Sequence, residues 1–248
     1  MPGLKMNLSP SSKWCRALKA CFPLIVLSGM AWAQDPANAG SSAELQRVLD
    51  KVDQAAAGFR TTQASFVWDQ YQKVVDETDT QKGIVYFRRA GNDIQMAADI
   101  SEPTPPKYLL FADGKVDLYQ PKIDQITRYN TGKDRAVVES FLVLGFGGSG
   151  RDMLKSFDVS YIQDEKVDGI DTSKLDLVPK SQKVRNTAAH IWLWIDTARG
   201  ISVQQKFFSP SGDYRLSKYS DIQLNQKIPD SAFKLKTTSK TKIVSPQG

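Results

Sequence analysis

Apolar residues recur at every second position in eleven short runs between residues 64 and 224, and this alternation is the feature that most limits the fold. A period of two is the period of a β-strand, whose successive side chains point to opposite faces of a sheet. Gly, Pro, Asn and Asp separate the runs, as they do in turns between strands. The predicted strands are residues 64–71, 83–89, 93–100, 107–112, 116–120, 125–129, 158–166, 174–179, 190–196, 201–208 and 215–224.

The turns between the runs predict how the strands pair. Asp113-Gly114 lies between two of them, and Gly accepts the positive φ that a tight hairpin turn requires. Asp168-Gly169, Arg199-Gly200 and Ser211-Gly212 occupy equivalent places later in the chain. Neighbouring strands are therefore expected to run antiparallel.

Three segments have the period of a helix instead. In residues 43–58 the apolar residues recur at three- and four-residue spacing up to Gly58, and residues 135–144 and 151–157 read as two further helices. The glycine-rich residues 145–150 between the last two predict a hinge, because glycine frees the backbone. The expected fold is α+β: a curled, antiparallel, unclosed β-barrel of about eleven strands, with helices covering its concave face.

The first 33 residues have the order of parts of a signal peptide. Lys5, Lys13, Arg16 and Lys19 precede an apolar stretch at 22–32, which ends in Ala31-Trp32-Ala33. The stretch is too short for a membrane span of about 20 residues. We therefore expect export, cleavage after Ala33 and a periplasmic mature protein.

Composition divides the mature chain into three parts. Residues 34–42 are small and polar and predict a flexible segment, with Ser42 as a helix N-cap. Residues 43–237 contain the predicted helices and strands and form one domain. Residues 238–248 read as a polar tail.

Cleavage would change both the cysteine count and the charge. It removes Cys15 and Cys21, which leaves no thiolate chemistry, and it leaves 29 Lys and Arg against 27 Asp and Glu. A charge of about +2 lacks the strong positive field of a nucleic-acid binder. We expect no cofactor, no nucleic-acid partner and a monomer.

Catalytic motifs do not emerge from the sequence. His190 is the one histidine, and no Gly-x-Ser-x-Gly elbow accompanies it. The glycines of 145–150 lack the Lys and Ser/Thr of a phosphate-binding loop, and no paired carboxylates suggest a hydrolase. We expect no catalytic or metal-binding residue and predict that the protein is not an enzyme.

The strands carry more apolar surface than one buried face needs. Trp192 and Trp194 alternate with Ile191 and Leu193, so this strand is apolar on both faces. Helices and crowded neighbouring side chains could cover both faces. Alternatively, the concave side is incompletely filled and leaves an apolar cavity for an acyl chain.

Arg89 is the charged residue of most interest. Val85, Phe87 and Arg89 share one face of a predicted strand. With five donors in a planar fork, Arg89 could fix a polar headgroup or hold a lid by hydrogen bonds. It could equally be an exposed charge at the end of a strand.

The order of helix, six strands, two helices, five strands and a closing Ile-Pro-x-x-x-Phe resembles the LolA family of periplasmic lipoprotein carriers. The stretches that carry the resemblance span about residues 44–237: 45–59, 62–66, 83–89, 111–115, 118–119, 125–127 and 228–233. The resemblance implies that acyl chains of a lipoprotein occupy the cavity of an unclosed barrel. It also implies that Arg89 is the residue that latches the lid, with Ile94 and Met96 as the next inward-facing positions.

The same resemblance implies partners and a route. An inner-membrane, ATP-driven transporter would load acylated lipoproteins, and an outer-membrane receptor would accept them. The alternative is a periplasmic lipid or lipoprotein sensor of the RseB kind, which signals to a partner protein. In both cases the residues expected to contact lipid are Phe66, Trp68, Val85, Phe87, Arg89, Ile94, Met96, Phe141, Leu144, Phe146, Met153, Trp192 and Trp194.

Overall fold

The structure is a computed structural model that describes residues 36–246 apart from 92, 133–134 and 143. The predicted signal peptide lies outside these residues. Among the helices of the described part, none is long and apolar enough to cross a membrane.

All eleven predicted strands are present, and most are longer than the alternation indicated. A twelfth strand lies in the predicted polar tail, which is therefore not irregular throughout. The strands are β1 Thr61–Gln72, β2 Glu77–Ala90, β3 Asp93–Glu102, β4 Lys107–Ala112, β5 Lys115–Gln120, β6 Gln125–Asn130, β7 Phe157–Val167, β8 Ile170–Pro179, β9 His190–Asp196, β10 Ser202–Phe208, β11 Tyr214–Leu224 and β12 Lys242–Val244.

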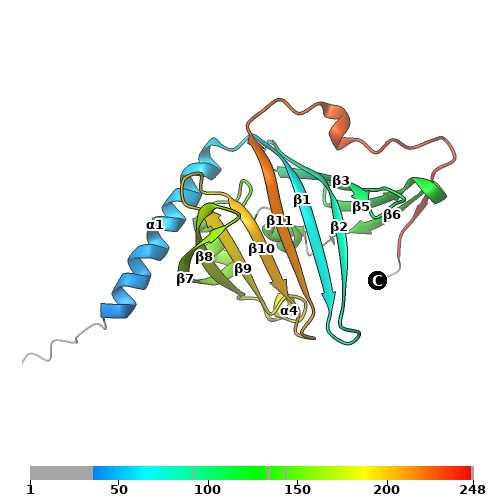
Figure 1. Ribbon diagram of the computed structural model, residues 1–248. Helices are drawn as coiled ribbons and strands as arrows, with labels where there is room; N and C mark the ends of the chain where they lie inside the picture. The colour runs from blue at the N-terminus through cyan, green and yellow to red at the C-terminus, as the bar shows by residue number, and fades with distance from the viewer. Residues whose placement is uncertain (1–35, 92, 133–134, 143, 247–248) are drawn as a thin grey trace, which may run out of the picture. The chain divides into compact units, whose positions relative to one another are not determined.

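One sheet contains all twelve strands, in the order β12-β6-β5-β4-β3-β2-β1-β11-β10-β9-β8-β7. Two antiparallel meanders, β1–β6 and β7–β11, meet where β1 pairs with β11. In Figure 1, β1 (cyan) and β11 (orange) lie side by side. β12 pairs with β6 in parallel, and no pairing of the described strands joins β7 to β12, so the barrel is unclosed as predicted.

In the part of the chain that the structure describes, four α-helices accompany the sheet. α1 spans Pro36–Gly58, α2 Arg135–Leu142, α3 Gly150–Ser156 and α4 Gln182–Arg185, the last of which sequence analysis missed. α1 starts six residues before the predicted N-cap at Ser42, so the prediction of a flexible segment at 34–42 is wrong for residues 36–42. α3 begins after Ser149, whose hydroxyl accepts a hydrogen bond from the Asp152 amide at 3.0 Å.

The inner face of the sheet, toward the helices, holds two apolar clusters. The first lies over β1–β4 and includes Phe66, Val85, Phe87 and Phe111, with Phe146 of the glycine-rich segment among them. The second joins α1, α3 and β7–β9 through Val48, Leu49, Val52, Met153, Phe157, Leu175, Leu177, Ile191, Leu193 and Ile195. Helices therefore cover the concave face, as predicted.

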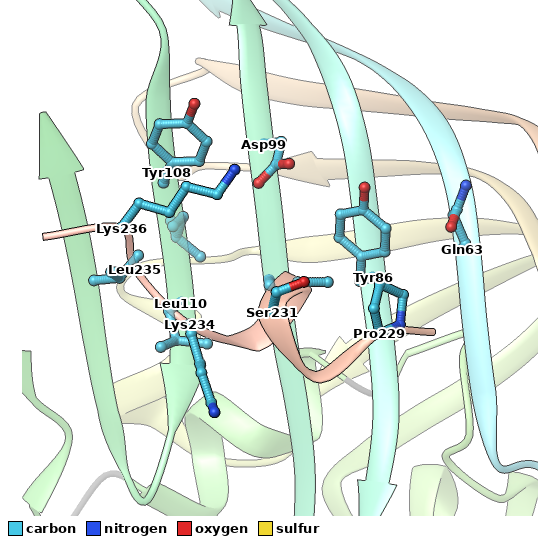
Figure 2. Close-up of a pocket in the computed structure, with 13 residues that line it drawn as sticks. Gln63, Tyr86, Asp99, Tyr108, Leu110, Pro229, Ser231, Lys234, Leu235 and Lys236 are labelled. Atoms are coloured by element: carbon cyan, nitrogen blue, oxygen red, sulfur yellow. The ribbon is translucent and has the colours of Figure 1, made fainter. Parts of the chain in front are cut away.

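The C-terminal segment covers part of the opposite, outer face. Figure 2 shows the chain around Ser231 crossing the strands that carry Tyr86, Asp99 and Tyr108. Phe233 is buried there, with the Arg88 guanidinium carbon 4.2 Å from its ring centroid. A cavity of about 220 Å³ remains beneath this segment. The covering explains why β2–β4 carry apolar residues on both faces.

Candidate functional site

The glycine-rich residues 145–150 form a lid over the inner face between α2 and α3. Phe146 is 1% exposed and inserts into the first cluster, with its ring stacked on Phe87 at 5.0 Å between centroids and edge-on to Tyr219 at 5.0 Å. One aromatic side chain of the lid thus fills the hollow over β1–β4. This lid is closed.

Two glycines let the lid lie this close to the sheet. Gly145 and Gly147 have φ of +83° and +86°, a backbone region that L side chains rarely adopt. A Cβ at Gly147 would come within 2.5 Å of the Phe59 ring, and one at Gly145 would overlap the Cβ of Ser202. Any larger residue at either position would lift the lid from the sheet.

Arg89 contacts the lid at one end, which is one of the three readings considered for it, and its side chain is also exposed. Its Nη2 donates to the Gly147 carbonyl at 3.0 Å, and its Nε lies 3.4 Å from the Phe59 carbonyl oxygen. The guanidinium carbon lies 5.7 Å from the Phe59 ring centroid. Arg89 therefore ties the lid to the residue that follows α1.

β10 holds the other end of the lid. Gln205 is buried, and its Nε2 donates to the Leu144 carbonyl at 2.6 Å. The backbone N–H of Ser202 donates to the Gly145 carbonyl at 3.1 Å. Both of these bonds are accepted by backbone carbonyls, which leaves the Phe146 side chain free to face the interior.

A cavity of about 320 Å³ lies beyond the lid, where the hairpin between β10 and β11 turns. Aromatic and polar side chains line it together: Gln70, Phe141, Thr187, Ala188, Phe207, Phe208, Ser209, Asp213, Tyr214 and Arg215. We call this cavity the acyl pocket, after the ligand that we propose for it. Phe141 of α2 and Phe207 of β10 lie 6.0 Å apart between centroids and form its aromatic wall. The volume falls in the range of ~300–1,000 Å³ typical of small-molecule sites.

Arg215 places a cation in this apolar wall. Its guanidinium carbon lies 5.0 Å from the Phe207 ring centroid and 5.9 Å from that of Trp68. The surrounding protein lowers the pKa of Arg215 by desolvation, although Tyr219 acts in the opposite direction, and the side chain stays open to the pocket. Burial likewise raises the pKa of Tyr219.

Most of the residues predicted to contact lipid lie on the inner side. Arg89 is the lid latch, and Trp68 lies between the first cluster and Arg215. The others on this side are packed into the clusters: Phe66, Val85, Phe87, Ile94, Met96, Phe141, Leu144, Phe146 and Met153. Of the thirteen, only Phe141 lines the acyl pocket. Whether any of them binds lipid stays a prediction.

Trp192 and Trp194 are the two that the structure does not bring to this site. They pair with Lys206 and Gln204, whereas inner-face Leu193 pairs with Gln205, so both tryptophans point to the outer face. Lys174 lies 4.0 Å and 4.8 Å from their ring centroids. Sequence analysis could not assign them to a face, because both faces of this strand are apolar and alternation does not say which face is inside.

Sequence analysis missed the residues that give the pocket its chemistry, chiefly Arg215 and Phe207. A usable signal was present for Gln70, since it follows Phe66 and Trp68 at steps of two. In the described residues, no group of three His, Cys, Asp or Glu side chains is placed to hold a metal ion.

Comparison with known proteins supports the fold alone. No protein-family model and no curated protein matches the sequence. An uncharacterized conserved protein from Thermus thermophilus is similar in structure, with TM-score 0.52 and 11% identity over 82% of this chain and 99% of that chain. MucB is similar with TM-score 0.50 and 10% identity over 78% of this chain.

This chain spans 63% of the length of MucB, which has also been solved in complex with MucA. The LolA superfamily protein NE2245 from Nitrosomonas europaea gives TM-score 0.39 at 16% identity, over 77% of this chain and 97% of that chain, too weak a likeness to carry an argument. The fold itself, a single open sheet with helices and a lid on its inner face, is the unclosed architecture that sequence analysis expected.

Proposed function

We propose that this protein is a non-enzymatic periplasmic carrier that binds the acyl chains of lipoproteins and moves them from the inner to the outer membrane. One observation carries the proposal: an apolar pocket of about 320 Å³ lies beside a lid that is fixed to the sheet by a few hydrogen bonds. Such a site can hold a chain without covalent chemistry.

The energetics suit reversible binding. Each methylene buried in an apolar site contributes about 0.8 kcal/mol. Release of the hydrogen bonds of Arg89 and Gln205 would let Phe146 leave the hollow and extend the acyl pocket along the inner face. Cargo would enter from an ATP-driven inner-membrane transporter and leave to an outer-membrane receptor.

Native mass spectrometry of the mature protein purified from the periplasm tests this function. We expect co-purifying acylated lipoprotein or lipid in the wild type. Phe141→Glu, which places a charge in the pocket wall, should lose it, whereas Ile162→Glu, the same change at an exposed position of β7, should keep it. Equal lipid loads in the two variants would contradict binding at this site.

The likeness to MucB favours a sensor as the second candidate. In a carrier, Arg89→Leu should retain bound cargo but fail to deliver it to acceptor membranes. Without the hydrogen bond of Arg89, opening of the lid is no longer coupled to release of the cargo. In a sensor, delivery is absent from the wild type too, and cargo binding changes the affinity for a partner protein instead.

A further inference from the structure

Arg215 differs from the other cations of the inner face because its donors have no protein partner. Within the described residues it makes no hydrogen bond and no ion pair, and its contacts are the rings of Phe207 and Trp68. Guanidinium has five N–H donors and no acceptor. The Arg215 side chain is exposed to the pocket, where water solvates its guanidinium, and an anion supplied from outside would give these donors a partner.

The neighbouring acid does not serve as the counter-ion. Asp213 lies on the rim of the same pocket, but its carboxylate accepts from the Lys73 backbone N–H at 2.8 Å and from the Ser211 hydroxyl at 2.7 Å. These bonds lower the pKa of Asp213 and hold the carboxylate in the turn. The guanidinium of Arg215 is left facing the pocket.

The polar groups beside Arg215 suit the head of an amphiphile. Gln70 lies directly across from Arg215 on β1, and both line the pocket together with Phe141 and Phe207. The pocket therefore presents a cation and an amide beside the aromatic wall of Phe141 and Phe207. This is the arrangement that an acyl chain with an anionic end requires.

We infer that the acyl pocket takes an amphiphile whose polar end carries a carboxylate or a phosphate, with Arg215 as the residue that binds that anion. This inference rests on the proposed function and narrows its ligand. The planar fork of guanidinium matches the oxygen pairs of both groups. The ligand must therefore carry an anionic group at the polar end of its acyl chain. A lipoprotein has such a group only where its peptide places a carboxylate beside the acylated end.

Displacement of a fluorescent acyl probe from the delipidated protein by matched ligands tests the inference. Dodecanoate is compared with dodecanol, and lauroyl lysophosphatidate with monolaurin, so that each pair differs mainly in the anion. We expect the anionic member of at least one pair to bind about 10- to 100-fold more tightly than its neutral partner. The pair that shows the difference identifies the head as carboxylate or phosphate.

Variants assign the difference to Arg215. Arg215→Gln should bring the anionic ligand to the affinity of its neutral partner and leave the neutral ligand unchanged, and Arg215→Lys should restore part of the preference. Lys218→Gln removes one positive charge from the same strand on the exposed outer face and should behave as wild type. Thermal unfolding of each variant checks that it folds.

Three outcomes would overturn the inference. Equal binding within both pairs would refute an anion site while leaving acyl binding intact. A preference that survives in Arg215→Gln would place the anion elsewhere. If none of the four ligands displaces the probe from the wild type, the proposed function fails together with the inference.

Discussion

The two ends of the inner face each present an arginine, and the two differ in what they touch. Arg89, at the end of β2, donates to the lid carbonyl of Gly147 and lies near that of Phe59. Arg215, near the start of β11, has aromatic rings beside it and no hydrogen-bond partner in the described residues. The first end is closed by Phe146, and the second retains the acyl pocket.

This difference separates a structural cation from a binding one. Hydrogen bonds to carbonyls use the donors of Arg89 to fix a segment of the chain, so its contribution is present without ligand. The donors of Arg215 remain available, so its contribution depends on what enters the pocket. The same residue type therefore serves two purposes on one face of the sheet.

The strongest test of the closed end is Phe146→Ala. Phe146 is nearly fully buried among Phe87 and Tyr219, so its truncation should lower the free energy of unfolding by about 3–5 kcal/mol. Urea denaturation measures this change. If the free energy of unfolding falls by less than about 1 kcal/mol, the stability of the first cluster does not depend on the lid. The two ends of the inner face would then not differ in the way described.

A smaller effect is expected from Arg89→Leu. Loss of the hydrogen bond to Gly147 should weaken lid closure by about 1 kcal/mol, because solvent at this exposed side chain offsets part of the gain from a charged donor. Hydrogen exchange at the amides of residues 145–150 should then speed up about fivefold. Arg88→Leu, on the outer face, is the control variant. If hydrogen exchange in Arg89→Leu is unchanged, Arg89 does not hold the lid.

Arg215→Leu should have the smallest effect on stability. The Arg215 side chain is exposed and makes no hydrogen bond or ion pair within the described residues, so its removal should leave the melting temperature of the ligand-free protein nearly unchanged. Differential scanning calorimetry on delipidated protein measures it. A fall as large as that of Arg89→Leu would mean that Arg215 has a structural partner after all.

Sequence analysis located the contact between Arg89 and the lid where a local pattern was present. Arg89 ends an alternating strand beside Val85 and Phe87, and the glycines at 145–150 mark a segment that needs unusual backbone angles. Both Arg89 and the segment 145–150 could therefore be proposed from the sequence. Arg215 follows a turn with no apolar pattern of its own. Its importance arises only from the strands that flank it.

The sequence by itself determined the strands, their antiparallel turns, the helical segments and the bend at the lid, because a period of two or of 3.6 and a glycine in a turn act within a few residues. Tertiary structure alone decided which face became the interior. Trp192 and Trp194 are apolar enough for either face, and the pairing of β9 with β10, together with helices on the side of Leu193, turned them outward. It also decided that the C-terminal segment covers the outer face of β2–β4, since contacts between residues more than a hundred positions apart leave no periodic trace in the chain.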